Sequence, residues 1–137
     1  MNKAKKWLAR GRRIEQEIAA LETAKRENFE HLTSTVGATD GIHAAGTKDP
    51  HVLDAFADFN LRISQRIAEL IRIRAELVSV IERVPDPRYR ELLLYRYVSG
   101  MTWEAVAVAM NYSFYHVVSE LHPKALAAVE PFLPTPI

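Results

Sequence analysis

The feature that most constrains this chain is a seven-residue repeat of apolar side chains in two long stretches, at residues 3–36 and 51–84, that contain no proline. The row in the second stretch consists of Phe56, Ile63, Leu70, Leu77 and Val84, and the row in the first of Trp7, Ile14, Leu21 and Asn28. Seven residues make nearly two helical turns, so each row forms one stripe along a helix. The chain is therefore expected to be all-α, with long helices at about 3–36 and 50–84.

The two long helices are expected to pack on each other as an antiparallel hairpin arm, residues 1–84. Three of the five glycines lie between the helices, which predicts a loop over residues 37–49. Asp49 can cap the second helix, and Pro50 suits its first turn. Both stripes are narrow and contain polar positions, so they could also recruit a second copy, which makes a homodimer through the hairpin a candidate assembly.

The sequence Pro85-Asp86-Pro87 ends the arm, because proline fixes its own φ and disfavours helix in the residue before it. Three short helices are expected to follow within residues 87–130. Asp86 would cap the first, which runs to Val98 and ends at Ser99-Gly100. Thr102 would cap the second, which ends at a turn formed by Asn111 and Tyr112. Ser113 would cap the third, and the proline-rich residues 131–137 are expected to form an extended tail.

Two short helices joined by a tight turn and braced by a preceding helix form a helix-turn-helix, whose second helix enters the major groove of duplex DNA. The inner face of the first motif helix is expected to comprise Ala105, Val106 and Ala109. The buried face of the second is expected to comprise Val117, Leu121 and Leu126. The second helix would leave exposed Phe114, Tyr115, His116, Ser119, Glu120 and His122. Pro123 should kink this helix or restart it.

Several residues of this segment match a known pattern. They are a leucine-rich helix (92–94), Gly100, the run Glu104-Ala105-Val106-Ala107, the turn Asn111-Tyr112-Ser113 and the trailing Ala125-Leu126. This pattern resembles region 4 of bacterial sigma factors. The aromatic-rich version looks like small prophage proteins of low-GC Gram-positive bacteria, related to phage late-gene transcriptional regulators of the ArpU and RinA type. The resemblance implies a cytoplasmic, DNA-binding transcription regulator and covers most of residues 87–130.

The DNA-reading helix is expected to span residues 114–122. Tyr115 and His116 lie near its start, where base contacts usually originate, although surface aromatics packed on a neighbour remain an alternative. The full set of expected DNA contacts is Ser113, Phe114, Tyr115, His116, Ser119, Lys124, Arg88 and Arg90. For the arginines the alternative is a salt bridge on the helix face, such as Arg88 with Glu91.

Charge leaves the function open between DNA and protein binding. Residues 1–26 hold eight Lys/Arg against three Glu, whereas residues 83–137 hold five of each sign. The basic segment could contact phosphates or form a solvated helix end. The balanced charge of residues 83–137 favours a rival function, docking on RNA polymerase or another phage protein. A further alternative is an oligomeric phage packaging component built on the long helices.

The sequence lacks the motifs that would indicate an enzyme, a metal or cofactor site, or a membrane or secreted protein. The chain has no cysteine, so disulfides, thiolate metal sites and cysteine nucleophiles are excluded. It shows no glycine-rich phosphate loop, no His-Glu-x-x-His motif and no nucleophile elbow, so we expect no enzyme activity, cofactor or metal. No apolar run follows the basic N-terminus, so neither a signal peptide nor a membrane partner is expected.

Overall fold

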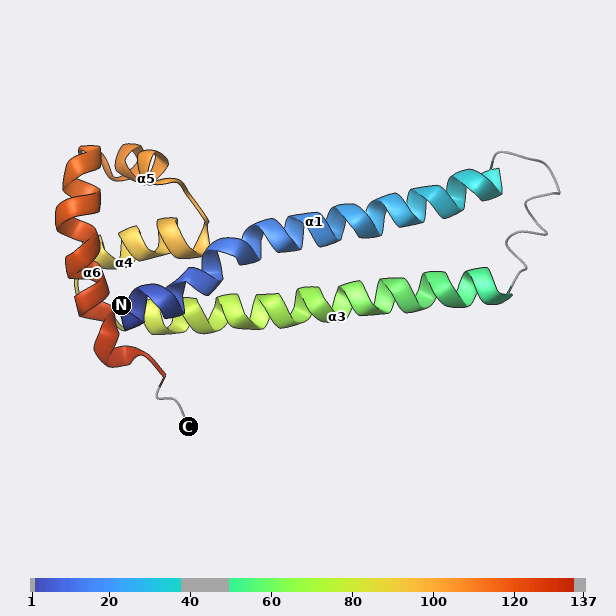
Figure 1. Ribbon diagram of the computed structural model, residues 1–137, viewed down its shortest axis with the longest axis horizontal. Helices are drawn as coiled ribbons and strands as arrows, with labels where there is room; N and C mark the ends of the chain where they lie inside the picture. The colour runs from blue at the N-terminus through green and yellow to red at the C-terminus, as the bar shows by residue number, and fades with distance from the viewer. Residues whose placement is uncertain (1, 38–49, 135–137) are drawn as a thin grey trace. The chain divides into compact units, whose positions relative to one another are not determined.

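A computed structural model describes residues 2–37 and 50–134 of the chain, with the side chains of residues 32–37 left aside. All regular secondary structure in these ranges is helical, which confirms the all-α prediction (Figure 1). Two long helices, α1 (Lys3–Gly37) and α3 (Pro50–Ile81), lie close to the predicted bounds. The shorter elements are α4 (Pro87–Leu93), η1 (Leu94–Val98), α5 (Trp103–Met110), η2 (His116–Leu121), α6 (His122–Val129) and η3 (Glu130–Phe132).

Most of the expected loop, residues 38–49, lies outside the described residues, as does Asp49 with its expected cap. Across the described ranges, no helix combines the length and the apolar character that a membrane span needs.

The chain divides into two compact units, and each draws on both long helices. The central unit comprises Glu17–Leu70. The terminal unit comprises Met1–Gln16 together with Ile71–Ile137. This grouping cuts across the expected arm of residues 1–84, because both ends of that arm pack with the segment that follows it.

In the central unit, α1 and α3 pair through a few apolar residues and several polar contacts. Ile18, Ile63 and Leu70 are buried. Arg66 Nε donates to Glu17 Oε2 at 2.8 Å, and Lys25 Nζ donates to Ser64 Oγ at 3.2 Å. Further along α1, the ring of Phe29 lies 6.3 Å from that of Phe56. Later residues of α1 thus meet earlier residues of α3, so the two segments run antiparallel in this unit.

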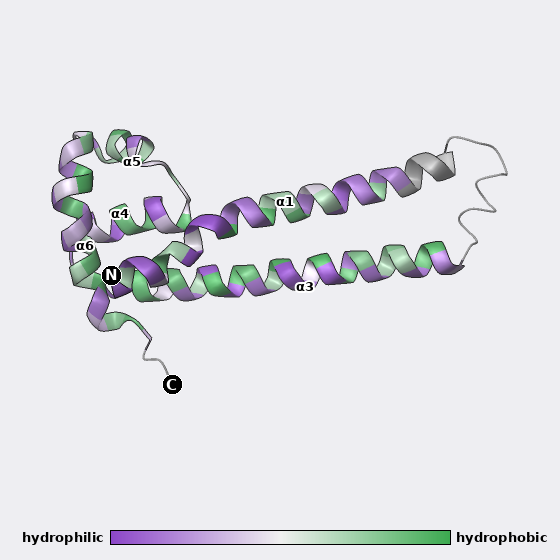
Figure 2. Ribbon diagram, in the orientation of Figure 1, coloured by the Kyte–Doolittle hydropathy of each residue, from purple (hydrophilic) through white to green (hydrophobic). Residues whose placement is uncertain are grey.

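The terminal unit holds most of the buried apolar side chains. They come from the start of α1, the end of α3 and the turn after it, and from α4, η1, α5, η2 and α6: Ala4, Leu8, Ile14, Leu77, Val80, Ile81, Val84, Leu92, Leu93, Tyr97, Val106, Ala107, Val117, Leu121, Ala125, Leu126 and Val129. Hydropathy colouring shows hydrophobic positions recurring along α3, whereas α1 is more hydrophilic (Figure 2). To this core α3 supplies Leu77, Val80 and Ile81, and α1 supplies Ala4, Leu8 and Ile14.

Gly11 permits a close approach between α1 and η1 in the terminal unit. A Cβ added at Gly11 would lie 2.2 Å from the carbonyl oxygen of Tyr97 and 2.6 Å from Leu77 Cδ1. Any side chain there would force α1 away from the backbone of η1, so glycine is required despite its low helix propensity.

Local signals in the terminal unit act as the sequence predicts. Asp86 accepts a hydrogen bond from the Arg88 amide, and Pro87 begins α4. Gly100 has a φ of 71°, and Asn111 ends α5 with a φ of 60°. Thr102 Oγ1 accepts from the Ala105 amide at 3.2 Å, and the predicted cap of α5 is confirmed.

Three predictions for this segment were wrong in detail. The inner face of α5 is Val106 and Ala107, whereas Ala105 and Ala109 are exposed. Apart from Glu104, α5 consists of apolar residues, so its periodicity could not identify the buried face. His122 was expected to be exposed, yet it is buried. The tail does not begin at residue 131, because η3 continues to Phe132, where the guanidinium of Arg83 lies 4.9 Å from the ring centre.

The predicted restart at Pro123 is not seen, because the backbone stays right-handed helical through Leu121 and His122. Helical backbone begins at Phe114 and widens into the π-helical turn η2, after which α6 begins at His122 with Pro123 in its first turn. The His122 amide donates to the Val117 carbonyl, five residues back. Because proline has no amide hydrogen and its ring crowds the preceding turn, a π-helical turn just before it accommodates the irregularity.

Candidate nucleic-acid interface

The segment from Ser113 to Lys124 separates a buried face from an exposed one. Val117 and Leu121 point into the core of the terminal unit. Tyr115 is 71% exposed and Phe114 is 48% exposed. The other exposed members of the segment are Ser113, Ser119, Glu120, Pro123 and Lys124. One side of this helical segment is therefore available for a ligand, and it carries aromatic, hydroxyl and charged groups.

The start of the segment is held by local bonds. Ser113 Oγ accepts from the His116 amide at 3.1 Å, which confirms the predicted cap. His116 is only half-buried, and its ring lies 5.0 Å from that of Tyr112 in the turn before it. Asn111 turns the chain between α5 and this cap. The left-handed turn at Asn111 and the cap from Ser113 thus fix the start of the helical segment that carries the exposed side chains.

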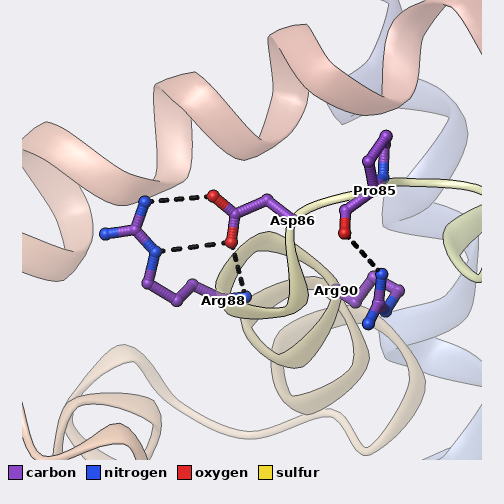
Figure 3. Close-up of polar contacts among 4 residues, drawn as sticks. All are labelled: Pro85, Asp86, Arg88 and Arg90. Atoms are coloured by element: carbon purple, nitrogen blue, oxygen red, sulfur yellow. Dashed lines mark hydrogen bonds and ion pairs between the residues drawn. The ribbon is translucent and has the colours of Figure 1, made fainter.

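Arg88 pairs with a different residue from the one considered in the sequence. Its Nη2 lies 3.0 Å from Asp86 Oδ2, and its Nε donates to Asp86 Oδ1 at 3.3 Å (Figure 3). The side-chain hydrogen bond from Arg88 holds the pKa of Asp86 below its usual value. Asp86 therefore both caps α4 and pairs with Arg88, in place of the Glu91 pair that the sequence offered as an alternative.

Arg90 closes the turn before α4. Its Nη1 donates to the carbonyls of Val84 at 2.6 Å and Pro85 at 2.8 Å; the bond to Pro85 is drawn in Figure 3. This guanidinium is half-buried, and it satisfies carbonyls at the end of the turn. Arg90 thus has a structural role in this conformation.

Below the exposed face lies an aromatic cluster that the sequence interpretation missed. The Tyr97 hydroxyl and His122 Nε2 are 2.7 Å apart and share a hydrogen bond. The ring of Trp103 lies 4.4 Å from that of His122. Burial, with the nearby charges of Lys5 and Arg96, lowers the pKa of His122 to about 4, and burial raises the pKa of Tyr97 to about 12. Both groups are therefore neutral near pH 7, and they join α6 to η1 and α5.

A spacing signal for the buried His122 is present in the sequence. Ala125, Leu126 and Val129 follow it by three, four and seven residues, which is the spacing of one helix face. All three are buried with it. The π-helical turn before Pro123 obscured this stripe, because it shifts the register from the one set by Val117 and Leu121.

Charge is segregated between the compact units. Residues 1–16 hold six Lys/Arg and one Glu, and residues 71–137 hold seven of each sign, so the terminal unit has a formal charge of +5. The central unit holds five Lys/Arg against nine Asp/Glu, a formal charge of −4. The basic N-terminal segment thus belongs to the same compact unit as the exposed segment 113–124.

Comparisons with protein-family models, curated proteins and solved structures give no match to this chain.

Proposed function

We propose that this protein is a DNA-binding transcription regulator of the phage or prophage type, with a sigma-region-4-like helix-turn-helix at residues 87–130. In this proposal α5 is the first motif helix, and the helical segment that begins at Phe114 reads the DNA. The observation that carries the proposal is the left-handed turn at Asn111, which lies between a helix capped by Thr102 and a helical start capped by Ser113. A helix-turn-helix needs such a short, fixed connection to present its second helix to the major groove.

The proposed base contacts are made by exposed side chains of the reading helix. Tyr115 would contact base edges at the start of the reading helix, and Ser119 would follow one turn later. His116, Phe114 and Ser113 would complete the contacts at this end, while Lys124 would contact phosphate.

Arg88 and Arg90 stabilise the structure and are not main DNA contacts in this proposal. Their guanidiniums already bind Asp86 and two backbone carbonyls, so they fix the turn before α4. Phosphate contacts provide much of the affinity for duplex DNA, and the segment 113–124 has Lys124 as its one Lys or Arg. In this proposal the basic residues of the first 16 positions supply the remaining phosphate contacts. The formal charge of +5 on the terminal unit supports this assignment.

The test is a selection of bound fragments from a random duplex library at near-physiological salt. Wild type is compared with the Tyr115→Ala/His116→Ala double variant and with Val108→Ala, a control on the exposed face of α5. We expect one motif to be enriched by wild type and by the control but lost in the double variant, because a good base contact provides about 1–3 kcal/mol of discrimination. No enrichment by wild type, with weak binding that vanishes as salt rises, would contradict sequence-specific reading.

A second candidate function is docking on RNA polymerase or another phage protein, and it has its own supporting observation. The outer face of α5 exposes apolar side chains next to Glu104: Val108 is 82% exposed, and Ala105 and Ala109 lie beside it on the helix. Exposed apolar patches commonly mark protein interaction sites. Binding of purified polymerase in the absence of DNA, lost on Val108→Glu and retained by the Tyr115→Ala/His116→Ala variant, would select this function.

A further inference from the structure

Two arginines from distant parts of the sequence meet in the terminal unit. The close contact between Gly11 and the Tyr97 carbonyl brings this part of α1 onto η1. A Cβ placed on Gly100 would in turn lie 3.4 Å from the carbonyl oxygen of Arg12. Residues 11–12 therefore run along residues 97–100, which places Arg12 near Arg96. The positive charge of Arg12 contributes, after burial, to lowering the pKa of Arg96, as expected for two neighbouring cations.

Neither guanidinium has an acidic partner among the described residues. Arg12 is half-buried, and its Nε is buried without a hydrogen-bond acceptor in the part of the chain that the structure describes. Arg96 Nη1 donates to the Met101 carbonyl at 2.9 Å, and its guanidinium lies 4.2 Å from the ring centre of Trp103. Glu104 favours the charged form of Arg96 through space but forms no ion pair with it in the described conformation.

This arrangement costs free energy when no ligand is bound. Buried polar groups nearly always have a hydrogen-bond partner, and two like charges held close together repel. An anion with several acceptor oxygens would screen the repulsion between the two guanidiniums. Phosphate suits this role, because the planar guanidinium fork matches its oxygens.

We propose that Arg12 and Arg96 form a phosphate-binding site that holds the DNA backbone. The inference rests on the proposed function for the source of the phosphate, and it adds a contact from α1 to the helix-turn-helix. The contact with Trp103 and the bond to Met101 hold the Arg96 guanidinium in place, while the half-buried Arg12 supplies the second positive charge. Arg88 is less suited to this role, because its charge is already paired with the Asp86 carboxylate, and Arg90 Nη1 already binds two backbone carbonyls.

The first experiment measures the affinity of the full chain for a random duplex as a function of salt. Wild type is compared with Arg12→Gln and with Arg72→Gln, which removes one charge from an exposed position on α3 of the same unit. We expect Arg12→Gln to weaken binding equally for all sequences and to reduce the slope of log K against log[salt] by about 0.9. Arg72→Gln should keep the wild-type slope. Thermal unfolding in chloride confirms that each variant folds.

The second experiment needs no DNA. The melting temperature is measured in inorganic phosphate and in chloride at equal ionic strength, because an anion that binds the folded state raises stability. We expect phosphate to raise the Tm of wild type and of Arg72→Gln, Arg12→Gln to abolish the rise, and Arg12→Lys to restore only part of it, since lysine keeps the charge but lacks the fork.

The two experiments separate the inference from the proposed function. If wild type binds duplex DNA and Arg12→Gln matches it in both salt slope and phosphate response, the phosphate site is refuted while the proposed function stands. If wild type binds no duplex but shows a phosphate response that depends on Arg12, the anion site exists, and DNA is refuted as its ligand together with the proposed function.

Discussion

Acidification should destabilise this protein through one buried histidine. His122 is 7% exposed and shares a hydrogen bond with the Tyr97 hydroxyl. Burial, reinforced by the charges of Lys5 and Arg96, lowers its pKa from 6.5 to about 4. Between these values the unfolded chain binds a proton at this residue that the folded chain does not. The free energy of unfolding must therefore fall as the pH falls through this window.

The size of the effect follows from the two pKa values. The full difference between 6.5 and about 4 corresponds to a loss of roughly 3 kcal/mol. The loss begins near the unfolded pKa and is complete below the folded one. At pH 5.0, about 2 kcal/mol of it should already have been lost relative to pH 7.5. This is a large fraction of the stability of a domain of ordinary size.

The assay is urea unfolding followed by circular dichroism at pH 7.5 and pH 5.0, for wild type and His122→Gln. Glutamine keeps an amide that can bond the Tyr97 hydroxyl but does not titrate, so the variant should lose about 2 kcal/mol less than wild type over this interval. The variant is expected to be less stable at pH 7.5, because packing against Trp103 is lost. Equal losses for the two proteins would refute the assignment of a buried, neutral His122.

Two further predictions test the packing of the terminal unit. Gly11→Ala should lower stability by about 2 kcal/mol or more, because the added Cβ would lie 2.2 Å from the Tyr97 carbonyl oxygen; helix propensity alone predicts a gain of about 1 kcal/mol, so an unchanged or higher Tm would contradict the close approach. Arg90→Met should cost about 1–3 kcal/mol in chemical unfolding, since the Val84 and Pro85 carbonyls lose their donor. The salt slope of DNA binding should be unchanged in this variant, and a reduced slope would restore Arg90 as a phosphate contact.

Local signals in the sequence were sufficient for the elements and their ends. The seven-residue rows predict the long helices, and the breaks at Pro85-Asp86-Pro87 and Ser99-Gly100 separate the shorter ones. Asp86, Thr102 and Ser113 act as caps because each bonds an amide only two or three residues away. Gly100 and Asn111 adopt positive φ because their side chains tolerate it. All these effects act within a few residues, so spacing along the chain reveals them.

The candidate site was only partly predictable, because signals that act within a few residues do not reveal a change of helical register or a contact with a distant segment. Exposure of Tyr115 and burial of Val117 follow from helical spacing at the start of the segment. The burial of His122 does not, because the π-helical turn before Pro123 changes the register. In α5, the predominance of apolar side chains left the choice between Ala105 and Ala107 to the contacts of the folded unit.

The sequence by itself therefore determined an all-α chain, the positions of its helices and the chemistry of the exposed segment. Only the tertiary structure decided that the basic N-terminal residues fold into the terminal unit, that Gly11 lies against the Tyr97 carbonyl and that Arg12 meets Arg96. These contacts join residues far apart along the chain. Periodicity and capping act over one or two helical turns, and they carry no information about which distant surfaces pack together.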